Sequence, residues 1–541
     1  MRCRKLIFNQ VAVAVLLPST QITAAPVTGK IVDAATGQIV ASRLYIQNSA
    51  SEWFFAESSS SNGAAVRYAK TNWANPLSVE VHTTLSAHPF RIGLPPGDYT
   101  FTAERGKEFR PLQKTVTVGT TPVTLTFQLQ HWVSMAERGW FSGDGHVHRS
   151  LAELPTLVLA EDLNVALPQT YWAIEGFTAP LQSAKNGKTE IPTGVIRADA
   201  THVIWPRNTE YEIYRFGEKI NNLGGVFILN HRESFTLGAP PMRPVAEQAH
   251  RHGALLDMDK HDWAWSFMLV PVMKIDLFEL ANNHMWRAEF GLTNFNQPAP
   301  AYMKLPNDGK SGSERDWIDY GFQSYYTLLD CDFRLRPTAG CASGVHPVPL
   351  GFGRVYVHCP RGFSYDDWIQ GLDEGRSFVT TGPMLLTKIN GDWPGGKFQL
   401  KSGETKTVKV SGTVLSEQPV REVELIVNGQ IAERIAVNQK LNRDGAWEAK
   451  FNTRIQLNGT SWIAARCWEA RNGKRVRFAH TAPTWFDAPG EPMSPRGEEI
   501  AFLIGRMQQQ IERNREMLPA NALNEYREAL ATYQEIAKRA R

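Results

Sequence analysis

The sequence has few cysteines and little excess charge. Its 541 residues include 5 cysteines, and no two of them have the Cys-x-x-Cys spacing of a zinc ribbon. The formal net charge of +4 falls to +1 without Arg2, Arg4 and Lys5 at the N-terminus. So small a surplus gives no basis for binding nucleic acid electrostatically.

Long apolar runs are also missing outside the N-terminus. Basic residues within 1–5 precede an apolar stretch over 7–17 and small residues that end at Ala25, which is the pattern of a signal peptide over 1–25. The stretch is short and contains Asn9 and Gln10, so cleavage is favoured over an uncleaved anchor, which stays the alternative. We therefore expect a secreted or periplasmic protein with no stable membrane span after signal cleavage.

The remaining cysteines bear on the expected compartment. Three of the four cluster in one stretch, so an oxidising compartment permits one disulfide of undetermined connectivity. We also expect at least one of the four to be a buried, inert thiol. They are Cys331, Cys341, Cys359 and Cys467.

Local patterns divide the mature chain into four parts. Short strand-like runs with Gly and Pro turns over 26–130 predict a β-sandwich. Strand-like pieces alternate with helix-like pieces over 131–386, which predicts a parallel α/β sheet or barrel. Short strands return over 387–490 and predict a second sandwich. Within 131–386 we expect helices over 210–223, 245–252 and 365–375.

The final part, 491–541, has two stripes of apolar residues at helical spacing. Ser494 and Pro495 have the residue types of a helix start, and Pro519 separates the two stripes. Because lone helices of this length are marginal in water, we expect them to dock on the body of the protein. A dimer seam is the alternative, and the sequence leaves the oligomeric state open.

Two histidines stand one residue apart in "GWFSGDGHVHRS", residues 139–150. Residues i and i+2 of a strand share a face, so His146 and His148 can reach one cation. An exposed pair of strand histidines is the alternative interpretation. Asp144, two residues before His146, either orients an imidazole or caps the Gly-Asp-Gly turn.

Further nitrogen and oxygen donors follow other apolar runs of the α/β region. His231 follows "VFILN", Glu279 lies in "KIDLFELANNH", Glu210 begins the segment after "NT", and His346 lies in a Gly-rich loop. In a β/α barrel the ends of strands converge, so we expect these donors to bind Zn²⁺, Mn²⁺ or Fe²⁺. The alternative is that they lie on different faces.

Other charged residues have two interpretations each. Arg232 either stabilises negative charge that develops on a substrate oxygen or is a surface cation. The cluster Asp257, Asp259 and His261, beside Trp263 and Trp265, either faces a substrate or lies in a solvated loop.

Several of these segments resemble a known family. "GWFSGDGHVHR", "NTEYE", "GGVFILNHRE", "LFELANNH" and "GRSFVTTGPML" are similar to the CehA/McbA-type branch of the PHP metallohydrolase superfamily. "VTGKIVDAATG" and "LPPGDYTFTAERGKEF" resemble a carboxypeptidase regulatory-like, transthyretin-type module. The resemblance implies a multidomain chain, with a distorted (β/α)7 PHP-like barrel flanked by β-sandwiches and followed by a short helical segment.

The resemblance also implies roles for single residues. It makes His146 and His148 the first-strand ligands, Glu210 a bridging carboxylate, His231 a post-strand ligand, and Glu279 a looser match. His346 resembles the histidine of a terminal Asp-x-His motif, but Gly344 stands where that motif has aspartate. The Asp-His that often follows the second strand is also missing from "AEDLNVALPQTYW". We therefore expect one or two ions rather than three.

These patterns predict an exported metal-dependent hydrolase. A metal-activated water would attack an ester, carbamate, amide or phosphoester of a small molecule or a polymer-derived fragment. The alternative function is a catalytically degenerate PHP-like protein that binds glycans or an envelope partner. The missing aspartate favours this alternative, whereas the retained donors favour the enzyme.

Overall fold

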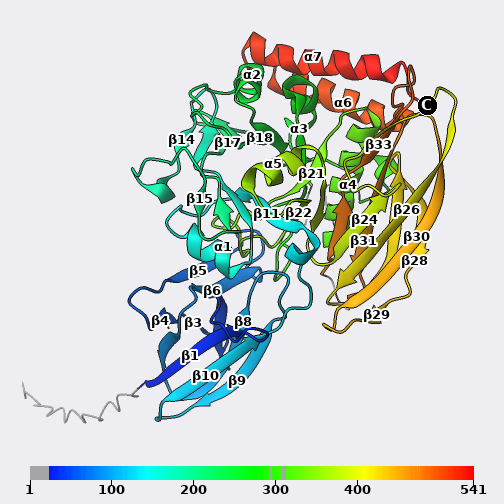
Figure 1. The fold of residues 1–541 in the computed structure, drawn as a ribbon. Helices are drawn as coiled ribbons and strands as arrows, with labels where there is room; N and C mark the ends of the chain where they lie inside the picture. Colours follow the sequence, from blue (N-terminus) through cyan, green and yellow to red (C-terminus); the bar gives the residue numbers. More distant parts are fainter. Residues whose placement is uncertain (1–23, 292–294, 307–311, 472, 474) are drawn as a thin grey trace, which may run out of the picture.

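The computed structural model describes residues 24–541, except 292–294, 307–311, 472 and 474. The chain is multidomain and rich in β-sheet (Figure 1). Most of the predicted signal peptide, with Cys3, lies outside the described residues.

The N-terminal part consists of two facing sheets, in agreement with the predicted sandwich. Strand β1 alternates buried and exposed side chains, as expected of a strand with one face on a core. Leu44, Phe90, Phe101 and Phe127 fill the space between the sheets. One sheet has β10-β1-β7-β4 in order, with β1 (Ala25–Asp33), β4 (Glu57–Ser58), β7 (Phe90–Leu94) and β10 (Val123–Leu129); the other has β5-β6-β2-β8-β9, with β2 (Ser42–Asn48), β3 (Trp53–Phe54) paired to β2, β5 (Ala65–Thr71), β6 (Val79–Leu85), β8 (Gly97–Glu104) and β9 (Leu112–Val118).

The central part contains two mixed sheets and several helices. One sheet has the order β14-β13-β17-β18-β19-β20-β21. The other begins β15-β16-β12-β11-β22-β23 and continues into the C-terminal part. The elements are β11 (Trp140–Val147), α1 (Leu154–Ala160), β12 (Val165–Pro168), β13 (Tyr171–Glu175), β14 (Leu181–Gln182), β15 (Ile196–Arg197), β16 (Val203–Ile204), β17 (Thr209–Phe216), β18 (Lys219–Leu229), α2 (Arg243–Arg251), β19 (Leu255–Met258), α3 (Ser266–Leu269), β20 (Leu277–Ala281), α4 (Glu314–Asp330), β21 (Arg336–Ala339), β22 (Arg354–His358), α5 (Tyr365–Asp373) and β23 (Ser377–Thr380).

The predicted helix over 210–223 is wrong, because this segment forms the hairpin β17–β18. Phe216 pairs with Lys219 across a two-residue turn. Gly217, in this turn, has a φ of +59°, in the left-handed region where glycine avoids the steric penalty of a Cβ. The predicted helices over 245–252 and 365–375 are confirmed as α2 and α5.

Pairing in the central part is both parallel and antiparallel. Strands β19, β20 and β21 run parallel to one another, and so do β11 and β12. Strand β18 runs antiparallel to both β17 and β19, and β22 runs antiparallel to β11. The polypeptide therefore departs from the uniform parallel order that alternating strands and helices predict.

The C-terminal part is a second pair of sheets, one of which is continuous with the central part. Strand β23 pairs antiparallel with β32 and thereby joins the two regions. Val410, Leu425, Ile463 and Phe486 are fully buried between the layers. One layer is β24 (Met384–Ile389), β26 (Thr405–Ser416), β30 (Trp447–Asn458) and β29 (Lys440–Leu441); the other has β25 (Lys397–Gln399), β27 (Val420–Val427), β28 (Gln430–Ala436), β31 (Ser461–Glu469), β32 (Phe478–Thr481) and β33 (Thr484–Asp487).

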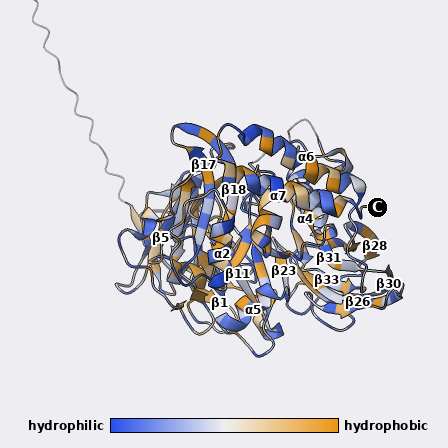
Figure 2. Cartoon of the chain, turned by 90° about the horizontal axis from the view of Figure 1, so that it is seen from above, coloured by the Kyte–Doolittle hydropathy of each residue, from blue (hydrophilic) through white to orange (hydrophobic). Residues whose placement is uncertain are grey.

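Two terminal helices, α6 (Gly497–Asn514) and α7 (Ala520–Ala537), pack over the central part (Figure 1). Both show alternating hydrophobic and hydrophilic bands (Figure 2). Leu503 and Tyr526 are fully buried, and the Tyr533 hydroxyl donates a hydrogen bond to the Phe267 carbonyl. The predicted docking is thus confirmed, although α6 is capped at Arg496 rather than at Ser494.

The cysteines of the described residues are buried free thiols, so the permitted disulfide is not formed. No helix within the described residues combines the length and apolarity that crossing a bilayer requires.

Candidate metal centre

The two histidines of the Gly-Asp-Gly-His-Val-His segment point at each other from the end of β11. His146 is the penultimate residue of the strand, and His148 follows it. Their Nε2 atoms are 3.1 Å apart, and both side chains are buried. The predicted shared face is therefore present. Two imidazole nitrogens at this separation can share one proton or bind one cation.

Glu210, on β17, completes a set of three donors. One carboxylate oxygen is 3.3 Å from His148 Nε2, and the other is 3.9 Å from His146 Nε2. Glu210 is fully buried, yet neither of its oxygens has a hydrogen-bond partner among the residues that the structure describes. Burial, followed by the nearby Glu212 carboxylate, raises the pKa of Glu210 well above its usual range. An unpartnered buried carboxylate is costly, and a divalent cation between these donors would remove that cost.

The other ring nitrogen of His146 faces two carboxylates. Nδ1 is 3.1 Å from a Glu279 oxygen on β20 and 4.0 Å from an Asp259 oxygen just after β19. A neutral imidazole has one free lone pair, so His146 can bind a metal through only one nitrogen. If Nε2 bound a metal, Nδ1–H would donate to Glu279, which is the usual carboxylate–histidine–metal arrangement.

The region around these donors has more buried carboxyl groups than buried cationic groups. The Lys260 ammonium contacts Asp259 and lies 3.1 Å from a Glu212 oxygen. Burial raises the pKa of Asp257 to about 8, and its Oδ2 accepts a hydrogen bond from the Thr338 hydroxyl. One lysine cannot neutralise the whole group, so a bound cation fits the electrostatics. The buried carboxylates are Glu210, Glu212, Asp257, Asp259 and Glu279.

Burial also keeps the histidines neutral. It lowers the pKa of His146 and His148 well below the usual range, with the neighbouring cationic groups acting in the same direction. It lowers the pKa of His346 to about 3. A neutral imidazole keeps the lone pair that a metal requires.

His346 lies across the cavity from the donor set. A cavity of about 370 Å³ is lined by His146, His148, His284 and His346. The rings of His284 and His346 are 5.5 Å apart, and the Nδ1 atom of each has no partner within the described residues. His346 therefore faces the same space as the donor set without belonging to the close group of donors.

The loop that carries His346 explains why glycine replaces the expected aspartate. Gly344 has a φ of +103°, and a Cβ there would lie 2.0 Å from the His148 carbonyl oxygen. Lys185 occupies the space beside it and donates to the carbonyls of both Gly344 and His148. No side chain fits at 344 without moving this loop, so position 344 contributes no ligand.

Asp144 holds this loop rather than an imidazole. Its Oδ1 accepts the backbone N–H of His146 at 3.0 Å and of Cys341 at 3.2 Å. Its Oδ2 accepts the N–H of Gly351 at 2.9 Å and the thiol of Cys341. Of its two predicted roles, Asp144 has that of a turn cap, and it also ties the end of β11 to the loop of His346.

His231 and Arg232 do not join the donor set. His231 Nε2 is hydrogen-bonded to the Thr209 hydroxyl at 2.8 Å, and Arg232 is exposed. The cause is the hairpin: because β18 runs antiparallel to β19, its last residue, Leu229, pairs with the first residue of β19, Leu255. The end of β18 therefore lies at the opposite end of β19 from Asp259. This geometry therefore does not place His231 and Arg232 with the other donors, contrary to what the sequence leads one to expect.

The cluster that follows β19 is buried and not a solvated loop. Asp259 belongs to the second close group of donors, with His146 and Glu279. His261 Nε2 lies 3.0 Å from the Glu279 carbonyl oxygen, and burial lowers its pKa. Trp263 lines the cavity, whereas Trp265 is fully buried.

Two cavity residues, Lys260 and Trp73, escaped sequence reasoning. The sequence does offer Glu212 as a donor beside Glu210, but the wrongly predicted helix over 210–223 conceals that the two share one face of β17. Lys260 lies between Asp259 and His261, in the cluster that the sequence indicates, but its sequence context predicts no role for it. Trp73 belongs to the N-terminal sandwich and is 69% exposed. Its ring centre lies 5.0 Å from that of His346, but no pattern in the neighbouring sequence predicts that it reaches this cavity.

Comparisons with known proteins add no assignment. The chain matches no family model, and neither the curated proteins nor the solved structures give a match. The case for a metal at this site therefore depends on the donor geometry described above.

Proposed function

We propose that the protein is a metal-dependent hydrolase of the PHP type, exported as residues 1–25 predict. The observation that carries the proposal is the buried triad His146, His148 and Glu210, whose ligand atoms lie within 4.8 Å of one another. Three protein ligands with one side open to a cavity are typical of catalytic rather than structural zinc-type sites. One ion fits this triad, because His146 supplies one lone pair.

We further propose that the central part is a distorted barrel with this centre at its mouth. Two links between the mixed sheets support this. The His148 N–H, just after β11, donates to the Ser343 carbonyl at 2.9 Å, a few residues beyond β21. Only two residues of chain separate β12, beside β11, from β13 in the other sheet. The neighbouring strands β11 and β12 are thus linked to the two ends of the run from β13 to β21, an arrangement that would suit closure.

A bound Zn²⁺, Mn²⁺ or Fe²⁺ ion would supply a coordinated water whose pKa is lowered toward about 7. The residues of the chain bind and orient the reactants around it. Glu279 holds the tautomer of His146. Lys260 lines the cavity and takes the role once expected of Arg232, the stabilisation of negative charge on a substrate oxygen. His284 and His346 are neutral and face the cavity, so one of them could accept the proton that the attacking water loses and then donate it to the leaving group.

The cavity walls indicate the kind of substrate. Trp73, Trp172 and Trp263 line the cavity together with polar Asn283 and Lys260. Indole rings bind flat, weakly polar groups. An ester, carbamate or phosphoester that carries such a group, either small or released from a polymer, fits a volume of about 370 Å³.

A degenerate protein that binds glycans is the second candidate. The same tryptophans favour it, because sugar rings also pack on indoles, and so does the glycine at 344. This candidate needs no bound metal. The buried triad would then contain an uncompensated carboxylate, which is why we favour the enzyme.

Metal content and turnover separate the two candidates. The purified full chain is analysed for bound metal and assayed with nitrophenyl esters and phosphoesters after addition of Zn²⁺ or Mn²⁺. We expect about one ion per chain and turnover that His148→Ala abolishes. His252→Ala, at the end of α2, is the control and should retain both. A metal-free, inactive wild-type protein would favour the binding protein.

A further inference from the structure

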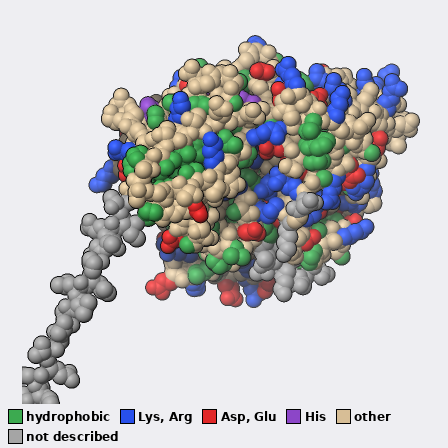
Figure 3. Space-filling view, turned by 90° about the horizontal axis from the view of Figure 1, so that it is seen from below, with side chains coloured by type: hydrophobic (Ala, Val, Ile, Leu, Met, Phe, Trp, Pro, Cys, Tyr) green, Lys and Arg blue, Asp and Glu red, His purple; other side chains and the backbone are tan. Residues whose placement is uncertain are grey.

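A second cavity lies where the three folded parts of the chain meet. Its volume is about 250 Å³, and it is distinct from the metal cavity. Lys107 reaches it from the N-terminal sandwich, Arg354 from β22, and Arg477 from the segment before β32. Lys and Arg side chains also gather between the two sandwiches in the view of the underside (Figure 3).

On one side of this cavity every arginine is paired with carboxylates. Arg43 pairs with Glu104 at 2.8 Å and also contacts Glu161. Arg287 lies 2.9 Å from Glu80 and 3.4 Å from Glu104. Two arginines thus face three carboxylates, so this side offers no free positive charge to a ligand.

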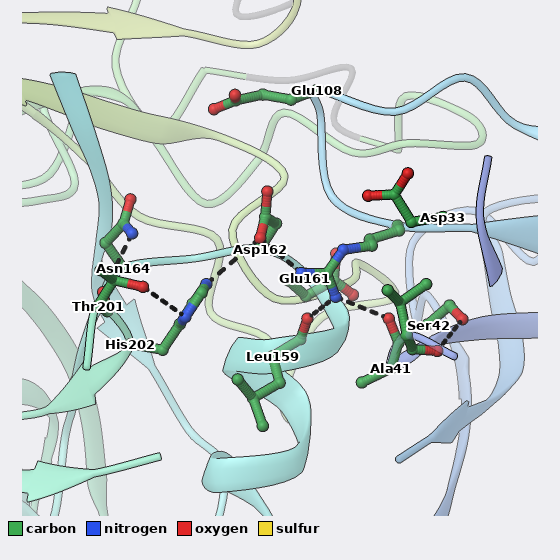
Figure 4. A network of polar contacts seen from close by, with 12 residues as sticks. Asp33, Ala41, Ser42, Glu108, Leu159, Glu161, Asp162, Asn164, Thr201 and His202 are labelled. Carbon is green, nitrogen blue, oxygen red and sulfur yellow. Dashed lines mark hydrogen bonds and ion pairs between the residues drawn. The ribbon is translucent and has the colours of Figure 1, made fainter. Parts of the chain in front are cut away.

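The carboxylate of the polar network beside that wall is also paired. Figure 4 shows Asp162 with His202 directed toward it, at 3.4 Å. Arg105 pairs with the same carboxylate at 2.6 Å. Burial acts to raise the pKa of Asp162, but Arg105 and His202 together outweigh it and hold the pKa below its usual range. This acidic group near the junction is thus already occupied.

On the other side the cations outnumber the available carboxylates. The Lys107 ammonium donates to the Thr381 carbonyl at 2.9 Å and lies 4.2 Å from the centre of the Phe352 ring. The Arg477 guanidinium lies 4.8 Å from the same ring. Both cations therefore approach one aromatic side chain, which holds them close despite their repulsion.

Backbone carbonyls satisfy most donors of the arginines. Arg354 donates to the carbonyls of Gly351, Glu161 and Asp162 at 2.7 to 3.4 Å. Arg477 donates to the Val476 and Arg287 carbonyls. Carbonyl groups accept hydrogen bonds but carry no net charge, so the positive charge stays uncompensated.

The acidic groups on this side are engaged or neutral. Glu314 lies 3.7 Å from Arg477 but is held by Arg475 at 2.8 Å. Glu469 accepts the Ser416 hydroxyl at 2.7 Å and contacts Arg471. Burial raises the pKa of Glu417 to about 7, so much of it is uncharged at neutral pH.

The pKa values of the cations agree with this surplus. Burial, followed by Arg354 and Arg477, lowers the pKa of Lys107 well below its usual range. Burial lowers the pKa of Arg477 to about 9 despite the attraction of Glu314.

We propose that Lys107, Arg354 and Arg477 form a binding site for a small oxyanion of the phosphate type, free or as the terminal phosphate of a larger compound. Charge-assisted hydrogen bonds from an ammonium and two guanidinium groups are the usual means of binding such a group. Each cation belongs to a different folded part. The anion would therefore hold the N-terminal sandwich, the central sheets and the C-terminal sandwich together.

Calorimetric titration of the full-length mature chain with inorganic phosphate, in chloride buffer, tests this proposal. Wild type should bind saturably, and Lys107→Met should lower the affinity about tenfold or more, since it removes one charged partner. Lys107→Arg should restore binding. Lys114→Met is the matched control, because Lys114 also donates to a carbonyl and lies over a phenylalanine ring but outside this cavity.

Two further arms complete the design. Phosphate also binds divalent metals, so the titration is repeated with His148→Ala, in which the proposed binding should persist even if the hydrolase proposal fails. Glycerol phosphate replaces inorganic phosphate to distinguish a free anion from a terminal phosphate. If Lys107→Met does not give the wild-type circular dichroism spectrum, Arg477→Met takes its place. The proposal is overturned if the wild type does not bind phosphate, or if the cavity variants bind it with the affinity of the wild type.

Discussion

Glu279→Gln tests how the metal centre is organised. The Glu279 carboxylate lies 3.1 Å from His146 Nδ1 and accepts the Asn283 N–H at 2.9 Å through its other oxygen. Glutamine has nearly the same shape, so the substitution removes the negative charge and leaves the packing in place. If Glu279 orients His146, we expect metal affinity to fall about 10- to 100-fold, or about 1.4 to 2.7 kcal/mol.

Competition with a chromogenic chelator measures that affinity, and two other variants calibrate it. Glu210→Gln removes a ligand and should lower the affinity more than Glu279→Gln does. Glu153→Gln, which changes a 38% exposed carboxylate outside the cavity, should leave it unchanged. Wild-type affinity in Glu279→Gln would refute the carboxylate–histidine–metal arrangement. A loss as large as that of Glu210→Gln would make Glu279 a direct ligand instead.

Three further predictions concern the cavity, pH and chelation. Trp73→Ala should raise KM about 2- to 10-fold at nearly constant kcat in steady-state kinetics, whereas Trp53→Ala on the same sandwich should not; equal effects would remove Trp73 from the substrate site. Burial lowers the pKa of His480 to about 3 in the folded protein. Below about pH 6.5 the unfolded chain therefore binds more protons than the folded protein, and the free energy of unfolding decreases as the pH is lowered. Urea unfolding should therefore show wild type losing about 2 kcal/mol more than His480→Gln between pH 7.5 and 5, and parallel losses would contradict this. A chelator should abolish turnover reversibly with an unchanged circular dichroism spectrum; unfolding on chelation would indicate a structural ion.

Sequence reasoning identified the parts of the site that depend on local geometry. The period of two in a strand placed His146 and His148 on one face, and the structure brings their nitrogens together. The strand "KIDLFELA" was recognised from its apolar run, and it delivers Glu279 to the same centre.

The misses arise from strand direction and tertiary contact. His231 follows an apolar strand as expected, but the tight turn at Gly217 makes that strand, β18, antiparallel to its neighbours and places its end away from Asp259. Trp73 reaches the cavity because the Tyr68 hydroxyl, on the same sandwich, donates to the His346 carbonyl and accepts the Gly344 N–H. Such contacts between distant segments leave no periodic signal in a single sequence.

Anomalous diffraction from crystals of the protein grown with Zn²⁺ or Mn²⁺ tests the central claim most directly. We predict a metal peak about 2.0 to 2.2 Å from the Nε2 atoms of His146 and His148 and from a Glu210 oxygen. A peak elsewhere, or a fully ordered triad with no metal at saturating concentration, would contradict it.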